Sequence, residues 1–217
     1  MKANLENWTL VIIGSWNSKI FNPRWVGEKL FGKNDLQIQI LIPVIPGFPT
    51  VLSADNIEII PAEESLTFRV KATTDAVLNE LEEKAIRALQ VLNHTPVRAI
   101  GVNFGFVEKQ IPDSVNKLFS LSDKEALEEI GEKSDQEHVS HRLQMDNGVL
   151  NLALTKTLDE LQVLLNFHLQ LDYPKNLENA DQALEFIKDK TIDFKNKAIE
   201  VLKSVYGLEF EEEQETE

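Results

Sequence analysis

The chain has no cysteine among its 217 residues. It therefore forms no disulfide, supplies no thiolate to a metal ion and offers no cysteine nucleophile to an enzyme mechanism. It also lacks any apolar run near the roughly 20 residues that a membrane-spanning helix needs. The short apolar run from Trp8 to Ile13 is not followed by the small residues of a signal-peptide cleavage site. We therefore expect a cytoplasmic protein without a membrane partner.

Sequence motifs for common chemistry are missing as well. The chain has no glycine-rich phosphate-binding loop and no Gly-x-Ser-x-Gly nucleophile motif. His138 and His141 are three residues apart in a predicted strand, which places them on opposite faces, so they cannot bind one metal ion together. Glu80, Glu82 and Glu83 are close together on a predicted helix, where a solvated face explains them better than an acid–base pair does. We predict no metal, no cofactor and no catalytic residue.

Negative charge is in excess, with 36 acidic residues against 22 basic ones and a formal net charge of −14. Six of the acidic residues lie in residues 209–217, which contain no basic residue, so the preceding chain carries −8. Nucleic-acid binding depends on clustered Lys and Arg, so we expect no nucleic-acid partner. A DNA-mimicking surface is one alternative, and an ordinary acidic protein with a disordered tail at 209–217 is the other.

The first half of the chain predicts strands followed by a long helix. Residues 8–16 are typical of a buried strand, because apolar residues fall on both of its faces. Asn22 and Pro23 are typical of a helix start, and Gly32 of its end. Three strands and a helix with leucines at three- and four-residue spacing then follow; these segments are 36–42, 56–60, 65–71 and 74–93.

A strand over residues 97–107 has an unusual composition on one face. Gly101, Asn103 and Gly105 share that face, while larger apolar residues share the other. Alternating glycines in a strand indicate that something approaches the backbone closely. A packed helix, a partner chain and a ligand each fit this pattern, and packing in the core is the default.

The second half predicts a similar arrangement of three strands and a long helix. Asn147-Gly148 is typical of a two-residue hairpin turn, which would set Met145 opposite Leu150 and Leu143 opposite Leu152. A third strand ends at Tyr173-Pro174, and a helix of about 25 residues is predicted from Ala180. Its buried stripe is predicted to contain Ala183, Leu184, Ile187, Phe194, Ala198, Val201, Leu202 and Val205.

The solvent-facing side of this second sheet supplies the candidate site. His168 lies on it between Asn166 and Gln170, and Arg142 shares the face if the three strands pair in order. Such side chains can hydrogen-bond a ligand or a partner, although the exposed face of an antiparallel sheet is polar in any case. We therefore name His168, Asn166, Gln170, Arg142 and Asn103 as candidate binding residues.

Three segments resemble a sporadically distributed family of bacterial proteins of unknown function. They are residues 8–31, the string Arg98-Ala99-Ile100-Gly101-Val102-Asn103-Phe104 after a long helix, and Leu169-Gln170-Leu171-Asp172 before the last helix. The chain has Val102-Asn103 where the family usually has Arg-Tyr. The resemblance covers most of the chain and implies an architecture and a bacterial or phage origin, because the family has no assigned reaction. Its sporadic distribution suggests a mobile-element or defence context.

Together these patterns predict an α+β protein in which long amphipathic helices cover one face of an antiparallel sheet, or of two related sheets. We expect two halves, 1–108 and 137–208, joined by a helical linker at 109–136; the second is a βββα unit, and one hypothesis is that two βββα units join into one continuous sheet. The functional expectation is a non-enzymatic binding or adaptor protein that associates with a protein partner or with itself. The alternative is an enzyme or small-molecule binder with a site near His168 or Asn103.

Overall fold

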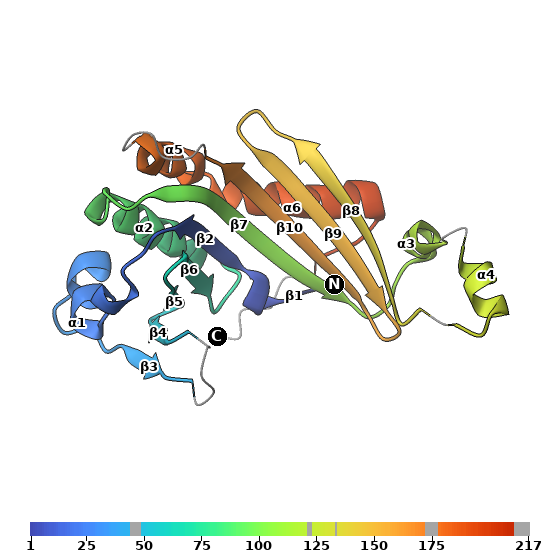
Figure 1. The fold of residues 1–217 in the computed structure, drawn as a ribbon, viewed down its shortest axis with the longest axis horizontal. Coiled ribbons are helices and arrows are strands. Elements are labelled where there is room, and N and C mark those ends of the chain that lie inside the picture. Colours follow the sequence, from blue (N-terminus) through green and yellow to red (C-terminus); the bar gives the residue numbers. More distant parts are fainter. Residues whose placement is uncertain (44–48, 121–122, 133, 172–177, 211–217) are drawn as a thin grey trace.

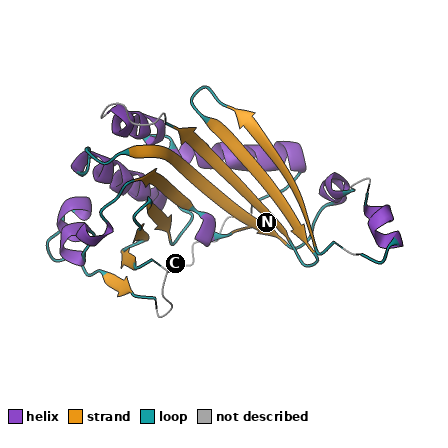
Figure 2. Cartoon of the chain, in the orientation of Figure 1, coloured by secondary structure: helices purple, strands orange, loops and turns teal. Residues whose placement is uncertain are grey.

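The computed structural model describes residues 1–43, 49–120, 123–132, 134–171 and 178–210. Within these residues the protein has the predicted α+β architecture, with one ten-stranded sheet whose paired strands run antiparallel. The long helices lie together on one face of the sheet, here called the inner face, and the opposite, outer face carries no long helix (Figures 1 and 2). None of the helices described is long and apolar enough to cross a membrane.

Groups of strands and helical segments follow one another along the chain. The strands are β1 (Lys2–Ala3), β2 (Thr9–Gly14), β3 (Gln39–Leu41), β4 (Val51–Ala54), β5 (Ile57–Pro61), β6 (Ser65–Val70), β7 (Val97–Glu108), β8 (Gln136–Gln144), β9 (Val149–Thr157) and β10 (Leu161–Gln170). The α-helices are α1 (Pro23–Val26), α2 (Asp75–Val91), α3 (Asp113–Asn116), α4 (Lys124–Glu129), α5 (Glu178–Ile187) and α6 (Thr191–Tyr206). Short 3₁₀ or π segments are η1 (Leu5–Asn7), η2 (Ser18–Ile20), η3 (Gly27–Phe31) and η4 (Lys117–Phe119).

The strand order is palindromic about the central β2–β7 pair. It runs β3-β4-β5-β6-β2-β7-β10-β9-β8, with β1 also paired to β7. The meander β4-β5-β6 therefore flanks β2 in the same way that β8-β9-β10 flanks β7. In chain order each half consists of a strand, a short helical segment, a three-strand meander and one or two longer helices. The two predicted meanders thus belong to one continuous sheet.

Apolar side chains on the inner face form the core with the helices. Alternate residues of β2, β7, β9 and β10 point to this face because successive strand residues alternate between faces. At its centre Phe104 packs edge-to-face on Trp8 and on Phe167, and Phe167 stacks on Phe194 of α6 at 4.6 Å between ring centroids. This aromatic chain links the first and second halves of the chain through one core.

The predicted helix from Ala180 is two helices, because the chain turns at Lys188–Lys190. Asp189 there has a φ of +59°. Glu82 of α2, predicted on a solvated face, is instead 7% exposed and stabilises this turn. Its carboxylate accepts hydrogen bonds from the backbone N–H groups of Asp189, Lys190 and Thr191 and from the Thr191 hydroxyl. A carboxylate from another helix thus satisfies the N–H groups that the start of α6 leaves open.

The hairpin between β8 and β9 forms in a register that differs from the predicted one. Leu143 lies opposite Leu150, rather than opposite Leu152, and Arg142 lies opposite Asn151. The loop has four residues instead of two, since the Met145 N–H donates to the Gly148 carbonyl. The shift amounts to two residues on one strand, so it leaves every side chain on its predicted face.

The first meander also differs from its prediction. Of the strand expected at 36–42, only Gln39–Leu41 is extended and paired, and Ile40 and Leu41 are exposed at the edge of the sheet. The strand β4 follows the proline-containing loop and was not predicted, because its four residues show no clear alternation. The start of α1 is as predicted: the Asn22 side chain accepts from the Trp25 N–H, and Gly32 ends the segment at φ +66°.

The first two residues of the predicted tail, Glu209 and Phe210, contact the rest of the protein. Leu208 is buried, the backbone of Glu209 accepts a hydrogen bond from the Met1 nitrogen, and Phe210 stacks against Trp8. An aromatic residue that reaches the core keeps these first tail residues in place. The rest of the predicted disordered tail, residues 211–217, lies outside the described residues.

Candidate functional site

A row of polar side chains crosses the whole outer face of the sheet. One residue from each strand, from β3 to β8, lies directly opposite its neighbours in this row, and every one is polar. The members of this polar row are Gln39, Ser53, Glu58, Arg69, Thr9, Asn103, Asn166, Asn151 and Arg142. The strands position these residues because the pleat sends every second side chain to the outer face.

Hydrogen bonds connect the centre of the polar row. Asn151 donates to Asn166 at 3.0 Å, Asn166 donates to Asn103 at 2.7 Å, and Asn103 donates to Thr9 at 3.0 Å. Directly opposed residues of neighbouring strands are close enough for such side-chain pairs. The predicted residues Asn103 and Asn166 are therefore brought together, and much of their hydrogen-bonding capacity is used on each other and on Asn151 and Thr9.

The glycines of β7 make room for this row and for η1. A Cβ added at Gly101 would lie 2.8 Å from the Asn166 amide nitrogen, and one at Gly105 would lie 2.4 Å from the Cβ of Asn7. The close approach that the alternating glycines predicted is thus made by segments of the same chain. Of the three readings of this pattern, packing within the chain is the one that the described residues account for.

The other predicted site residues lie on the same face, where His168 and Gln170 contact each other and Arg142 lies apart from them. His168 is two residues along β10 from Asn166, and its Nε2 lies 3.4 Å from the Gln170 side-chain oxygen. Gln170 also donates to the Arg98 carbonyl at 3.1 Å. Arg142 ends the polar row on the edge strand β8, where its guanidinium is exposed and has no bonding partner among the described residues.

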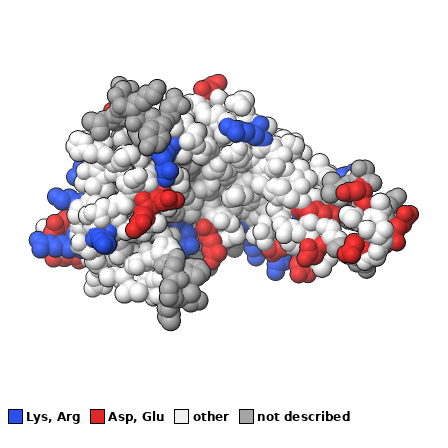
Figure 3. Space-filling view, viewed as in Figure 1, with Lys and Arg blue, Asp and Glu red and all other residues white. Residues whose placement is uncertain are grey.

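The outer face carries little charge. In Figure 3 the surface over β7, β10 and β9 shows few coloured atoms, while Asp, Glu, Lys and Arg are more frequent at the two ends of the molecule and beside the strands of the first half. Leu164 of β10 is 37% exposed on this face. The outer face is therefore a broad, nearly neutral surface on a chain whose formal charge is −14.

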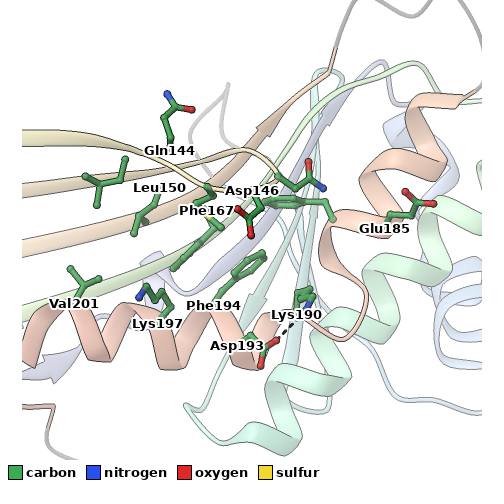
Figure 4. A pocket seen from close by; sticks show the side chains of 14 residues that line it. Gln144, Asp146, Leu150, Phe167, Glu185, Lys190, Asp193, Phe194, Lys197 and Val201 are labelled. Atoms are coloured by element: carbon green, nitrogen blue, oxygen red, sulfur yellow. Dashed lines mark hydrogen bonds and ion pairs between the residues drawn. The ribbon is translucent and has the colours of Figure 1, made fainter. Parts of the chain in front are cut away.

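A cleft opens on the inner face, between α6 and the β8–β9 hairpin (Figure 4). It contains two adjoining cavities of about 630 and 410 Å³, which share Leu143 and Val201 in their walls. Phe167 and Phe194 line the larger cavity, and Tyr206 lines the smaller one. Neither cavity is lined by His168 or Asn103, so the predicted ligand-binding residues and these cavities lie on different faces of the sheet.

The walls of the cleft include apolar side chains that face solvent. Leu143 of β8 is 42% exposed and Val205 of α6 is 67% exposed. The sequence pattern placed Val205 in a buried stripe, which is wrong because Val205 lies at the open smaller cavity, beside Leu143 and Leu152. The apolar periodicity of the sequence could not predict this cleft. Periodicity identifies the apolar face of a helix but does not show whether another segment covers that face.

Burial raises the pKa of the Tyr206 phenol above its ordinary value, because the ionised form loses hydration at this site. The group stays neutral at physiological pH, so the smaller cavity gains no charge from it. Within the described residues, no group of three or more His, Asp and Glu could hold a metal ion.

No protein-family model and no curated protein matches this sequence. The resemblance to the sporadic bacterial family therefore stays a prediction. Two of the three segments that carry it are nonetheless neighbours in space, because the Leu171 N–H donates to the Arg98 carbonyl at 2.9 Å. Asp172 lies outside the described residues.

Proposed function

We propose that the protein is a non-enzymatic binding or adaptor protein that contacts a protein partner through the outer face of its sheet. The observation that carries this proposal is the broad, nearly neutral outer face, uncovered by a long helix and crossed by the polar row. The centres of protein–protein interfaces are depleted of charged residues, and arginine is enriched in them. Arg142 supplies an open guanidinium at the end of the row.

The arrangement of the row favours binding over catalysis. The amides of Asn103 and Asn166 are held by hydrogen bonds to neighbouring strands, so they form a fixed surface with little freedom to move protons. Acid–base catalysis needs a titratable group within hydrogen-bond reach of a substrate. The central amides and the Thr9 hydroxyl do not titrate near neutral pH, so they suit contact with another protein better than proton transfer.

Affinity purification from cells of the source organism tests this function. The full chain and its Leu164→Asp variant, which places a charge in the centre of the outer face, would be compared by quantitative mass spectrometry. The matched control is Leu158→Asp, since Leu158 is 86% exposed in the β9–β10 turn. We expect a stoichiometric protein that is captured by the wild type and the control and lost with Leu164→Asp. Equal capture by all three chains would contradict the proposal.

A further inference from the structure

Because the strand order is palindromic, the cleft can be compared with the equivalent position in the first half of the chain. β8 and β9 correspond to β4 and β5, and the helices α5 and α6 follow β10 as α2 follows β6. In the first half the helical segment Pro23–Phe31 packs against α2, and its residues Val26 and Leu30 join the core. Leu52 of β4 is 1% exposed, whereas Leu143, on the same face of β8, is 42% exposed.

The corresponding helical segment of the second half fills only one end of the cleft. Val115 of α3 and Phe119 of η4 are buried there, and Leu118 lies at the rim of the smaller cavity. No helix of the described residues covers the remaining length beside α6. A position that a helix occupies in the first half of the molecule is therefore open in the second.

The dimensions of the cleft suit a helix. The residues of α6 and its preceding turn that line it extend from Lys190 to Tyr206, a length of roughly 24 Å at 1.5 Å per residue. The two cavities follow one another along this length and meet at Leu143 and Val201. Helices recognised in grooves insert apolar side chains at positions such as i, i+4 and i+7, which would reach successive cavities of this kind.

Charges at the mouth of the cleft indicate the chemistry of its occupant. Lys190 is paired with Asp193, and Lys197 is paired with Glu200. Asp146 of the β8–β9 loop and Glu185 of α5 also line the larger cavity, and they have no cationic partner among the described residues. Cationic groups on an occupant would pair with these carboxylates.

From these features we infer that the cleft binds an amphipathic helix of a partner protein, about four turns long, whose apolar stripe is flanked by lysine or arginine. The inference rests on the proposed binding function and adds a second surface to it. Residues 123–132 of the chain itself contain five acidic residues and one lysine, and a second copy would bring a further charge of −14. Both are poorer electrostatic matches than a basic helix.

Synthetic peptides test the inference on the full chain. The probe is a fluorescent 17-residue helix with a leucine stripe flanked by lysine; its controls are a scrambled peptide of the same composition and a peptide with glutamate in place of lysine. We expect the probe to bind at least tenfold more tightly than either control in fluorescence anisotropy at 150 mM salt. Leu143→Asp and Val205→Asp should each weaken this binding at least tenfold, and Leu158→Asp should leave it unchanged.

Other occupants would be revealed by outcomes that overturn the inference. Equal binding of the scrambled peptide, or binding that survives both cleft substitutions, shows attraction to an acidic surface only. Because the chain has no cysteine, an Ile130→Cys, Val205→Cys double variant contains only the two introduced thiols. Rapid disulfide formation within one chain would show that the segment with α4 occupies the cleft. Disulfide-linked dimers would show that a second copy of the chain does. A co-purified apolar small molecule displaced by Leu143→Asp would overturn it too. The Leu164→Asp comparison on the outer face stays independent of all these results.

Discussion

Glu82 is the residue on which the junction between the two halves depends most. Its carboxylate on α2 accepts four hydrogen bonds from the turn that begins α6. A buried carboxylate with this many donors is strongly stabilised, and its removal leaves the donors without a partner. The sequence showed Glu82 as one of three neighbouring acids on a helix, and nothing in that local pattern could identify donors more than 100 residues away.

Substitution of Glu82 should therefore destabilise the fold. We expect Glu82→Ala to lower the free energy of unfolding by about 2–4 kcal/mol, because several charge-assisted hydrogen bonds are lost. Glu82→Gln should cost less, since the amide oxygen still accepts. Urea unfolding measures the change, with Glu83→Gln as the control because the Glu83 side chain is 73% exposed. Equal effects at Glu82 and Glu83 would show that the cap contributes nothing.

The burial of Tyr206 predicts how its phenol ionises as pH rises. Its raised pKa in the folded protein means that burial stabilises the neutral phenol. The resulting stabilisation is fully present below the unfolded pKa of about 10 and is lost as pH rises through the folded value. In a Tyr173→Phe variant, where Tyr206 is the only tyrosine, absorbance at 295 nm should titrate above pH 10 while the far-ultraviolet circular dichroism is unchanged. A midpoint at or below 10 in the folded protein would contradict the burial of this side chain.

At the scale of elements, the β8–β9 hairpin depends on Gly148. Its φ is +96°, and an added Cβ would lie 2.4 Å from the His168 carbonyl oxygen. Both the backbone conformation and the neighbouring strand therefore exclude a side chain. The sequence signal Asn147-Gly148 located the turn correctly, but a loop of four residues and a loop of two share that signal.

Two glycines allow strain and steric clash to be separated. Gly131 has a similar φ of +86° but no atom within 4 Å of an added Cβ. We expect Gly131→Ala to cost about 1 kcal/mol from the positive φ alone, and Gly148→Ala about 2–4 kcal/mol because the clash adds to it. Thermal or urea unfolding of both variants measures the difference. Equal losses would mean that the hairpin can shift away from β10.

Sequence patterns predicted long and regular elements better than short or interrupted ones. The cap at Thr74, the alternation in β6 and β10, and the start of α1 at Asn22 follow from local chemistry, and each is present. The break between α5 and α6 was missed because a distant carboxylate stabilises it. The polar row could be predicted only in part. Strand alternation placed Asn103 on one face of its strand and Asn166 on the outer face of its own, but the contact between them depends on the β7–β10 pairing, which no local signal specifies.

The whole molecule should unfold as one unit despite its two-part strand order. The β7–β10 ladder and the aromatic contacts around Phe104 join the halves in one core. All three tryptophans, Trp8, Trp16 and Trp25, lie in the first half of the chain. Their fluorescence should therefore follow the same denaturant transition as far-ultraviolet circular dichroism, which reports both halves.

A substitution in the second half sharpens this test. Leu154 of β9 is fully buried, and Leu154→Ala should cost about 3 kcal/mol through the cavity that it leaves. In one cooperative unit the tryptophan transition shifts by the same amount as the circular dichroism transition. A tryptophan transition that does not move would show that the halves unfold independently.

Native mass spectrometry of the full chain, purified gently from cells of the source organism, tests the central claim that this is a protein-binding module. The account predicts a species whose mass equals the chain plus a second protein in a fixed ratio, retained by Leu158→Asp and lost by Leu164→Asp. A species that instead carries a stoichiometric metabolite of small mass, with no protein partner, would contradict it.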